Sequence, residues 1–350
     1  MAEDSQANDR PRGKKRDTEE AGYNSGDSDL DLALERFKDS DDNSDYNRQQ
    51  YEKDIEFGRM GDQWDGATRN QRKEEGRPCL TINKLPSFIR QVVNESRQNK
   101  PGIIINPIDS GADPETARVL NGIVRAILRN SNADQAFDTG IDCSVSGGFG
   151  FMRVDIEYGH EQTFDMEVRV KRIMDPLTVH WDVTTESFDA EDWKYGFVSS
   201  LISEAEFKKD YPDAEPIDFA EGSQEDIYNT WKSAEHGVRV AEYFAKEEEK
   251  HELWLIQGFG YQRPDGEVID TKAIRKDALP GLARQWGESM GAEIPENISD
   301  EDLIAYFFEL RGLKVLKTRE VAGTKVVKRI ITGKEIIDQS AWPGINIPII

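Results

Sequence analysis

The segment 76–107, which reads GRPCLTINKLPSFIRQVVNESRQNKPGIIINP, constrains the fold most strongly because it combines three structural signals in a short stretch. After an extended start, Asn83 can cap a helix that runs to Asn99, and Pro86 falls in its first turn, where a missing N–H does no harm. The apolar residues of this helix recur at the spacing of one helical face, which predicts core contacts for Leu85, Phe88, Ile89, Val92 and Val93. The next residues, GIIINP, predict a buried strand closed by Pro107.

The same part of the chain is basic although the whole chain is acidic. Eight Lys and Arg residues stand against three acidic residues over 69–100, whereas the full sequence of 350 residues has a formal net charge of −23. Such acidity argues against nonspecific wrapping of nucleic acid, which requires clustered cations. It leaves open a passage through which a duplex slides without sticking, and it keeps a self-assembling subunit soluble before assembly.

Composition and cysteine usage narrow the class of protein further. Hydrophobic residues make up 37% of the chain and charged residues 32%, which is typical of a soluble protein with a core. No apolar run is long enough for a membrane span, and the N-terminus lacks the apolar segment of a signal peptide, so we expect no membrane partner. Cys79 and Cys143 lie far apart outside any CxxC motif and are expected to be buried thiols in a reducing cytoplasm.

Helical patterns account for about half of the remaining elements. Residues 1–28 are predicted to be a disordered acidic arm, followed by a polar helical arm over 29–62 with two helices. Ser131 is expected to open another helix, in which Asp134 completes a capping-box-like pattern. Three more helices are expected over SEAEFKKDYP, over 271–286 with an interruption at Pro280, and over DEDLIAYFFELRG. A helix that Asp113 caps is predicted to turn these residues to the core: Leu120, Ile123, Val124, Ile127 and Leu128.

Strand patterns complete an α+β fold with mainly antiparallel strands. The stretches 151–158 and 165–173 predict a hairpin, because Met166, Val168 and Val170 alternate with charged residues. Shorter strands are expected over 178–182 and 195–201. The later strands are predicted over GVRVAEYFAK, HELWLIQG, KVLKTREV and TKVVKRIITG.

The motifs of the chain predict no catalytic residue, no metal site and no cofactor. The GGFGF turn over 147–151 lacks the lysine and the spacing of a P-loop, and the four histidines lack zinc-site spacing. One acidic cluster lacks the glycine of an EF-hand: Asp182, Glu186, Asp189 and Asp192. PDGEVIDTK superficially matches the PD…(D/E)xK pattern of nucleases, with a spacing too short for neighbouring strands, through Asp265, Asp270 and Lys272.

The strands expected over 312–334 carry a second basic patch in this acidic chain. Such a patch could face DNA phosphates or an acidic partner, and an ordinary solvated hairpin face is about equally compatible with the pattern. The residues predicted to make the contact are Lys314, Lys317, Arg319, Lys325, Lys328, Arg329 and Lys334.

Ordered blocks of the sequence resemble bacteriophage portal proteins, the head-to-tail connectors, and specifically the large portals of short-tailed phages. The blocks from about Gln63 onward are GDQWD, GRPCLTINKL, VVNESRQNKP, IIINPID, ADPETARVLNGIVRAILRNSNAD, SVSGGFGFMRV, RVKRIMDPLTVHWD, FDAEDWKYGFV, EAEFKKDYPDA, VRVAEYF, REVAGTKVVKRIITGKEII and WPGINIPII. The similarity is weakest over 260–311. Because the chain ends in the strand-like run INIPII, we expect it to be an N-terminal fragment of a longer protein.

The resemblance implies a non-enzymatic subunit of a dodecameric ring at one capsid vertex of the virion, assembled in the host cytoplasm. It implies a channel for double-stranded DNA in packaging and ejection, and as partners other copies of the chain, terminase, tail or adaptor proteins, and capsid and scaffolding proteins. In these terms 63–259 form a wing-like core, 260–335 a stem/clip-like helix and β-hairpin, and 336–350 the start of a return into the wing. The segment 76–107 then belongs to the wing, with its basic residues facing acidic surfaces of adjacent subunits.

Two other classes of function remain as alternatives. One is a metal-dependent nuclease or terminase-like packaging enzyme, which would cleave DNA with the help of Asp270. The other is a capsid adaptor or scaffold that binds proteins but has no DNA channel. A mass measurement on the full-length protein separates a ring from these alternatives.

Overall fold

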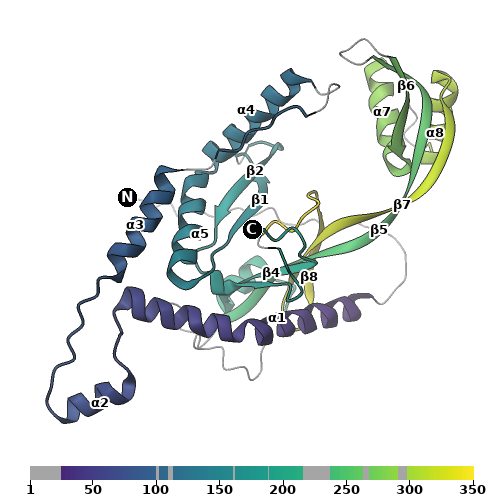
Figure 1. Ribbon diagram of the computed structural model, residues 1–350. Coiled ribbons are helices and arrows are strands. Elements are labelled where there is room, and N and C mark those ends of the chain that lie inside the picture. The colour runs from purple at the N-terminus through teal and green to yellow at the C-terminus, as the bar shows by residue number, and fades with distance from the viewer. Residues whose placement is uncertain are drawn as a thin grey trace, which may run out of the picture. The chain divides into compact units, whose positions relative to one another are not determined.

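The computed structural model describes residues 25–99, 102–108, 113–160, 162–187, 189–215, 237–262, 268–290 and 298–350. The described residues of 1–102, 123–246 and 326–350 form one compact unit, and those of 103–122 and 247–325 form a second. The described residues form helices and two antiparallel sheets, which confirms the predicted α+β class (Figure 1). None of the described helices has the length and apolar character that a membrane crossing requires.

The first unit starts with one long helix, α1 (Ser25–Ile55), which continues into a π-helical turn at Glu56–Met60. The prediction of two helices here was wrong. Ser40 and Ser44 are typical of helix ends, but their side chains make contacts that leave the helix intact. The Ser40 hydroxyl donates to the carbonyl oxygen of Trp181 at 2.8 Å, and the Ser44 hydroxyl accepts from Arg48 Nε at 2.7 Å.

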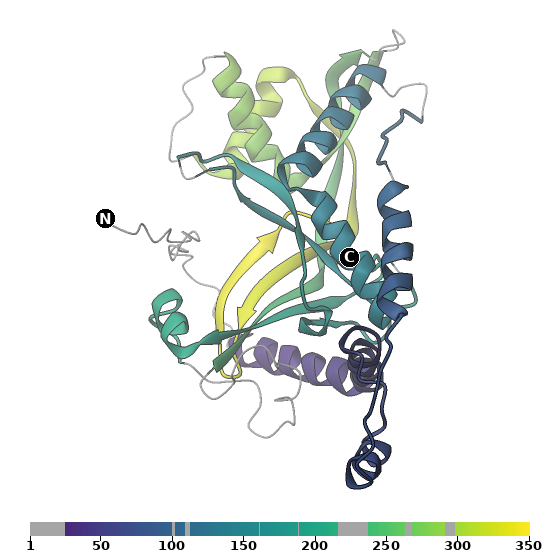
Figure 2. The same cartoon turned by 90° about the vertical axis from the view of Figure 1, so that its left-hand side faces the viewer.

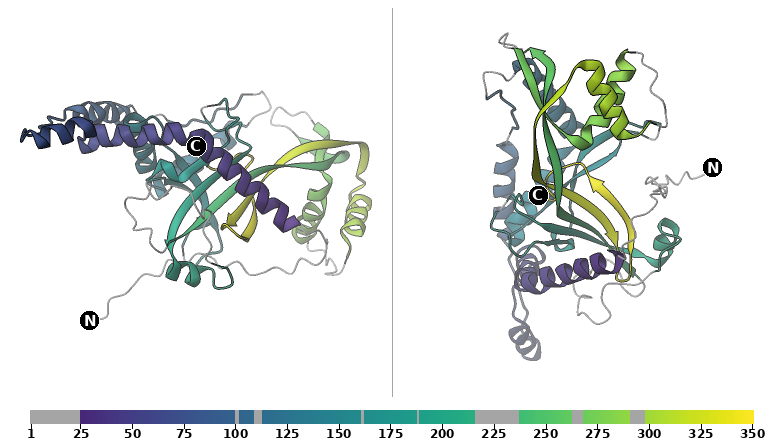
Figure 3. Two further views of the ribbon diagram at one scale, coloured as in Figure 1. Left: turned by 90° about the horizontal axis from the view of Figure 1, so that it is seen from below. Right: turned by 90° about the vertical axis from the view of Figure 1, so that its right-hand side faces the viewer.

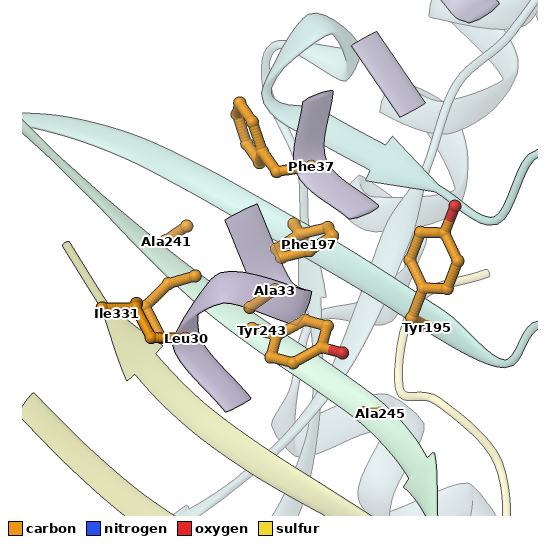
Figure 4. Packing of buried hydrophobic residues seen from close by; sticks show 9 residues of the cluster. All are labelled: Leu30, Ala33, Phe37, Tyr195, Phe197, Ala241, Tyr243, Ala245 and Ile331. Carbon is orange, nitrogen blue, oxygen red and sulfur yellow. The ribbon is translucent and has the colours of Figure 1, made fainter. Parts of the chain in front are cut away.

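α1 lies across the largest sheet of this unit and covers one of its faces (Figure 3). Its buried residues Leu30, Ala33 and Phe37 recur at helical spacing, as expected for one face of a helix. They pack on aromatic and small residues of three strands (Figure 4), namely Tyr195, Phe197, Ala241, Tyr243, Ala245 and Ile331. Phe197 and Tyr243 stack with ring centroids 4.5 Å apart, so this core joins α1 to the centre of the sheet.

The sheet beneath α1 has the strand order β3-β4-β5-β7-β8, and β6 pairs with β5. The strands are β3 (Val179–Trp181), β4 (Tyr195–Ser203), β5 (Gly237–Gln262), β7 (Lys314–Ile331) and β8 (Ile336–Trp342). β5 and β7 each run without interruption from one unit into the other. The sequence had predicted two strands in each of these stretches, and the expected hairpin within 312–334 is instead a turn at 332–335 between β7 and β8.

The helices that follow α1 are α2 (Gly66–Glu74), α3 (Leu85–Gln98), α4 (Pro114–Asn130) and α5 (Ala133–Gly147). The helix predicted after Asn83 is confirmed as α3, which begins at Leu85. The side-chain oxygen of Asn83 accepts from the backbone N–H of Leu85 at 3.1 Å. The strand predicted over GIIINP is wrong, because described residues 102–108 form no strand, and Asn121 holds both backbone groups of Ile105.

The α4–α5 corner also departs from the predicted capping. Asn132 precedes α5 in the left-handed conformation, with a φ of 50°, and makes no capping bond with its side chain. The Ser131 hydroxyl, expected to open the helix, instead accepts from the backbone N–H of Val170 at 3.1 Å. The corner is therefore fixed by its contact with the following hairpin rather than by a capping box.

That hairpin consists of β1 (Met152–Tyr158) and β2 (Met166–Arg172), as the alternating pattern predicted (Figure 2). Ile349 forms a bridge with Arg153, so the last residues of the chain lie along the other edge of β1. Close packing requires a glycine at position 150, just before β1, because a Cβ there would lie 2.2 Å from the carbonyl oxygen of Gly140.

The second unit packs two helices, α7 (Leu279–Met290) and α8 (Asp300–Arg311), on β5 and β6 (Val268–Arg275). The helix predicted over 271–286 is wrong in its first part, since β6 continues to Arg275 and Pro280 lies in the first turn of α7. α8 is confirmed, with the Ser299 hydroxyl accepting from the N–H of Asp302 and with Gly312 at a φ of 64° after its end. The core of this unit is formed by Ile256, Ile274, Leu279, Ala283, Leu303, Phe307 and Leu313.

Candidate functional site

The seven basic residues predicted as a contact site lie on β7 and the turn after it, but they do not share one environment. Lys314, Lys317 and Arg319 occupy the part of β7 in the second unit, where the strand is exposed on both faces. Among the described residues none of these three forms an ion pair. Lys325, also in the second unit, lies 3.9 Å from Glu247.

The other three residues belong to the first unit and are already paired there. Lys328 Nζ lies 3.0 Å from Glu242, and Lys334 pairs with Glu215. Arg329 is buried and binds Asp29 at 3.1 Å. These three cations therefore already have acidic partners within the subunit, unlike Lys314, Lys317 and Arg319.

The exposed end of β7 is balanced by the neighbouring strand of its own sheet. Over 314–325, β7 carries four basic residues and one acidic residue, while β5 carries four acidic residues and one basic residue over 247–258. A ribbon with balanced charge attracts phosphates much less than the sequence of β7 alone indicates. The acidic partner strand is a feature that only the pairing reveals.

Lys328 takes part in an ion network that joins β1 to the large sheet. Glu242 on β5 lies between Arg153 on β1, at 2.6 Å, and Lys328. Burial opposes ionisation of the Glu242 carboxyl, but the Arg153 guanidinium and the Lys328 ammonium outweigh burial and lower its pKa. Asp155, next to Arg153 and Lys171, extends the network along the hairpin.

The most buried histidine has a structural environment as well. The Arg48 guanidinium, itself buried, donates to the carbonyl oxygens of Leu177 at 2.5 Å and Val179 at 2.6 Å, and its Nη2 lies 3.1 Å from His180 Nδ1. Burial, reinforced by the Arg48 charge, holds the pKa of His180 well below 6.5. This cluster fixes α1 to β3 and offers no free proton donor.

The acidic cluster that lacks the EF-hand glycine forms hydrogen bonds within its own loop. Asp192 accepts from the Thr185 hydroxyl and from the backbone N–H of Glu186, both at 2.6 Å, and Asp182 accepts from the N–H of Lys194 at 3.0 Å. No group of His, Cys, Asp and Glu within the described ranges is arranged to hold a metal ion. Of the nuclease-like pattern, Asp265 lies outside the described residues.

Two uncovered apolar surfaces of the first unit are the features that the sequence missed. The α3 surface consists of Leu80, Ile82, Leu85, Phe88 and Val92. The hairpin tip consists of Tyr158, Phe164, Met166 and Val168. All nine side chains are exposed, although the α3 stripe was predicted to face the core, where only Val93 is fully buried. The alternation around Met166 was the available signal for the second surface.

Comparison with known proteins adds two findings. The chain matches the profile of the phage P22-like portal protein family over residues 34–350, which include both units. It is 26% identical over 210 residues to the portal protein of Acyrthosiphon pisum secondary endosymbiont phage 1. The match covers 57% of this chain and 29% of that protein, so the matched region spans less than a third of its relative's length.

Proposed function

Because the chain belongs to the phage P22-like portal protein family, we propose that it serves as a subunit of the ring that occupies one vertex of a phage capsid. The observation that carries this proposal is the continuous family match from residue 34 to residue 350. The family is a structural capsid component rather than an enzyme. The role of this chain is therefore sought in its surfaces instead of in a catalytic site.

The finer parts of the proposal concern what the ring carries and binds. We propose that it has twelve subunits, conducts double-stranded DNA in packaging and ejection, and docks terminase and later tail or adaptor proteins. The exposed Lys314, Lys317 and Arg319 are the proposed contacts with DNA or with an acidic partner, because they lack ion pairs among the described residues. Lys325, Lys328, Arg329 and Lys334 have acidic partners within the subunit, which makes them weaker candidates for this contact.

The ring is tested by measuring the mass of the full-length protein and imaging it in negative stain. The expected result is a twelvefold particle with an open pore. A monomer would contradict the proposal, and a particle without a pore would favour the channel-less adaptor.

The nuclease alternative has its own test. Divalent-metal-dependent DNA cleavage that Asp270→Ala abolishes would favour the nuclease; we expect no cleavage.

The contact residues are tested separately by charge reversal in the full-length protein. Lys314→Glu combined with Lys317→Glu and Arg319→Glu is expected to reduce DNA packaging or adaptor binding by assembled heads. The matched control reverses Lys38 and Lys53, which are exposed on α1 in the other unit. Packaging and adaptor binding equal to those of the control would remove the three residues from the proposal while leaving the ring intact.

A further inference from the structure

α3 has a wider apolar arc than its own subunit covers. α3 contacts α5 and the π-helical turn that follows α1, where Ile89 lies beside Gly58, and Val93 is buried. Phe88 and Val92 lie on the other half of the same arc and are 63% and 50% exposed. Ile82, just before the helix, is 83% exposed and extends this surface. Large apolar side chains grouped in this way mark an interaction surface rather than the scattered exposure of ordinary proteins.

The hairpin tip is a second apolar surface, and its shape is held from the opposite face. Tyr158 pairs directly with Met166, so their side chains share one face of the hairpin. Phe164, in the loop, is 95% exposed. On the other face Arg169 lies 2.8 Å from Glu167, and Lys171 lies 2.5 Å from Glu157. A tip that presents an aromatic residue and a methionine is suited to fill a pocket on a partner.

The two surfaces lie on opposite sides of α5. That helix packs against α3 on one side and against β2 on the other. Figures 1 and 2 show α3 and the hairpin tip apart from each other on these two sides. The surfaces of one copy therefore cannot cover each other. A closed ring of identical subunits needs two different surfaces on each copy, because every head-to-tail contact joins one to the other.

Charge favours the same pairing. The stretch 157–167 contains four acidic residues, of which Glu157 and Glu167 pair with Lys171 and Arg169, whereas Asp165 has no ion pair among the described residues. The stretch 80–98, which contains the α3 surface, has three basic residues and one acidic residue, and of the basic ones Arg97 pairs with Asp138. Lys84 and Arg90 are exposed there, and no described residue forms an ion pair with either. Opposite charge around two apolar patches steers their encounter and rejects the like-with-like contacts of tip with tip.

We propose that the hairpin tip of one copy packs on the α3 surface of the next copy, and that this contact closes the ring. The inference rests on the proposed function and specifies the surfaces through which it is achieved. Phe164 and Met166 are the side chains that insert, and Ile82, Phe88 and Val92 form the surface that receives them. Asp165 lies beside the inserting residues and Lys84 beside the receiving surface, and the two carry opposite charges.

Cysteine cross-linking of the full-length protein tests the contact. Phe164→Cys combined with Phe88→Cys, in a background that lacks other exposed cysteines, is expected to give a ladder of covalent oligomers on mild oxidation. Each single variant, and Phe164→Cys with Tyr46→Cys on the exposed face of α1, should give no ladder. Equal ladders in the Tyr46 control would overturn the proposed contact.

A second experiment disrupts the proposed contact by substitution. Phe164→Asp is expected to leave the full-length protein as unassembled subunits with unchanged thermal unfolding, whereas Tyr46→Asp, which replaces another exposed aromatic residue, should still assemble. A wild-type ring that shows no ladder and persists in Phe164→Asp would overturn this contact and leave the proposed function intact. A wild-type protein that stays monomeric would overturn both.

Discussion

The helices α1 and α3 differ in how far the subunit covers their apolar residues. α1 is polar over most of its length, yet one face of it is fully covered by its own chain. α3 has the clearer apolar stripe, yet half of that stripe is exposed to solvent. Of the two helices, α1 has the more polar sequence and is nevertheless the better anchored within the subunit.

The difference shows what each signal reports. An apolar stripe reports the burial that the assembled protein achieves, whether the covering surface comes from the same chain or from another. A polar helix can instead be held by directed bonds from a few buried groups, as Arg48 and Ser40 hold α1 to β3. We therefore expect α1 to determine the stability of the subunit and α3 to determine its assembly.

The largest effect is expected from the anchor of α1. Arg48→Met removes the donors to the carbonyl oxygens of Leu177 and Val179 and should lower the free energy of unfolding by about 4 kcal/mol. Lys53→Met, at an exposed position of the same helix, should change it by less than about 0.5 kcal/mol. Chemical denaturation followed by circular dichroism measures both; equal losses in the two variants would show that Arg48 is no anchor.

A second effect concerns the contact between α1 and α5. A Cβ on Gly147 would lie 2.2 Å from Cδ2 of Tyr51, so Gly147→Ala should destabilise the subunit by about 2 kcal/mol through overpacking. Gly122→Ala in α4, where no heavy atom lies within 4 Å, should instead stabilise by about 0.5–1 kcal/mol. Thermal melting of the two variants in one buffer would contradict the packing if both changed stability in the same direction.

The attachment of α1 should also depend on pH. Below pH 6.5 the unfolded chain binds a proton at His180, while burial and the Arg48 charge keep the folded residue neutral, so stability falls as the pH decreases. The loss is at most about 1.4 kcal/mol per pH unit below the ordinary pKa, and it ends where the folded residue itself binds a proton. His180→Gln, which keeps an acceptor for Arg48, should show a correspondingly weaker dependence in unfolding titrations. Parallel pH profiles would exclude His180 as the cause.

The smallest effect on the subunit is expected at α3 itself. Phe88→Ala should change the unfolding free energy of the unassembled chain by no more than about 0.5 kcal/mol, because the ring is exposed. Val93→Ala, one turn away on the buried half, should cost about 2 kcal/mol. Denaturation midpoints that fall more for Phe88→Ala than for Val93→Ala would mean that α3 is covered within the subunit.

Elements with local signals could be predicted from the sequence. Ser299 and Gly312 delimit α8 through bonds to their own neighbours, and the alternation of Met166, Val168 and Val170 sufficed for the hairpin. The long strands could not be predicted in the same way. Gly323 suggests a break in β7, but the strand continues through it. The glycine is needed there for close packing, because a Cβ would lie 2.8 Å from the His251 ring.

The candidate site was the least predictable part for the same reason. The sequence identifies Lys328 and Arg329 as basic residues but cannot show that Glu242 and Asp29, 86 and 300 residues away, already bind them. It marks Phe88 as a core residue without indicating which chain supplies the core. Partners distant in sequence decide both questions.

Labelling of a cysteine on the α3 surface tests the central claim most directly. In full-length Phe88→Cys protein, the rate of thiol alkylation should be high in unassembled subunits and fall by at least tenfold in the assembled ring, while Tyr46→Cys stays equally reactive in both states. A Phe88→Cys thiol that reacts at the same rate in the ring and in the free subunit would contradict the account.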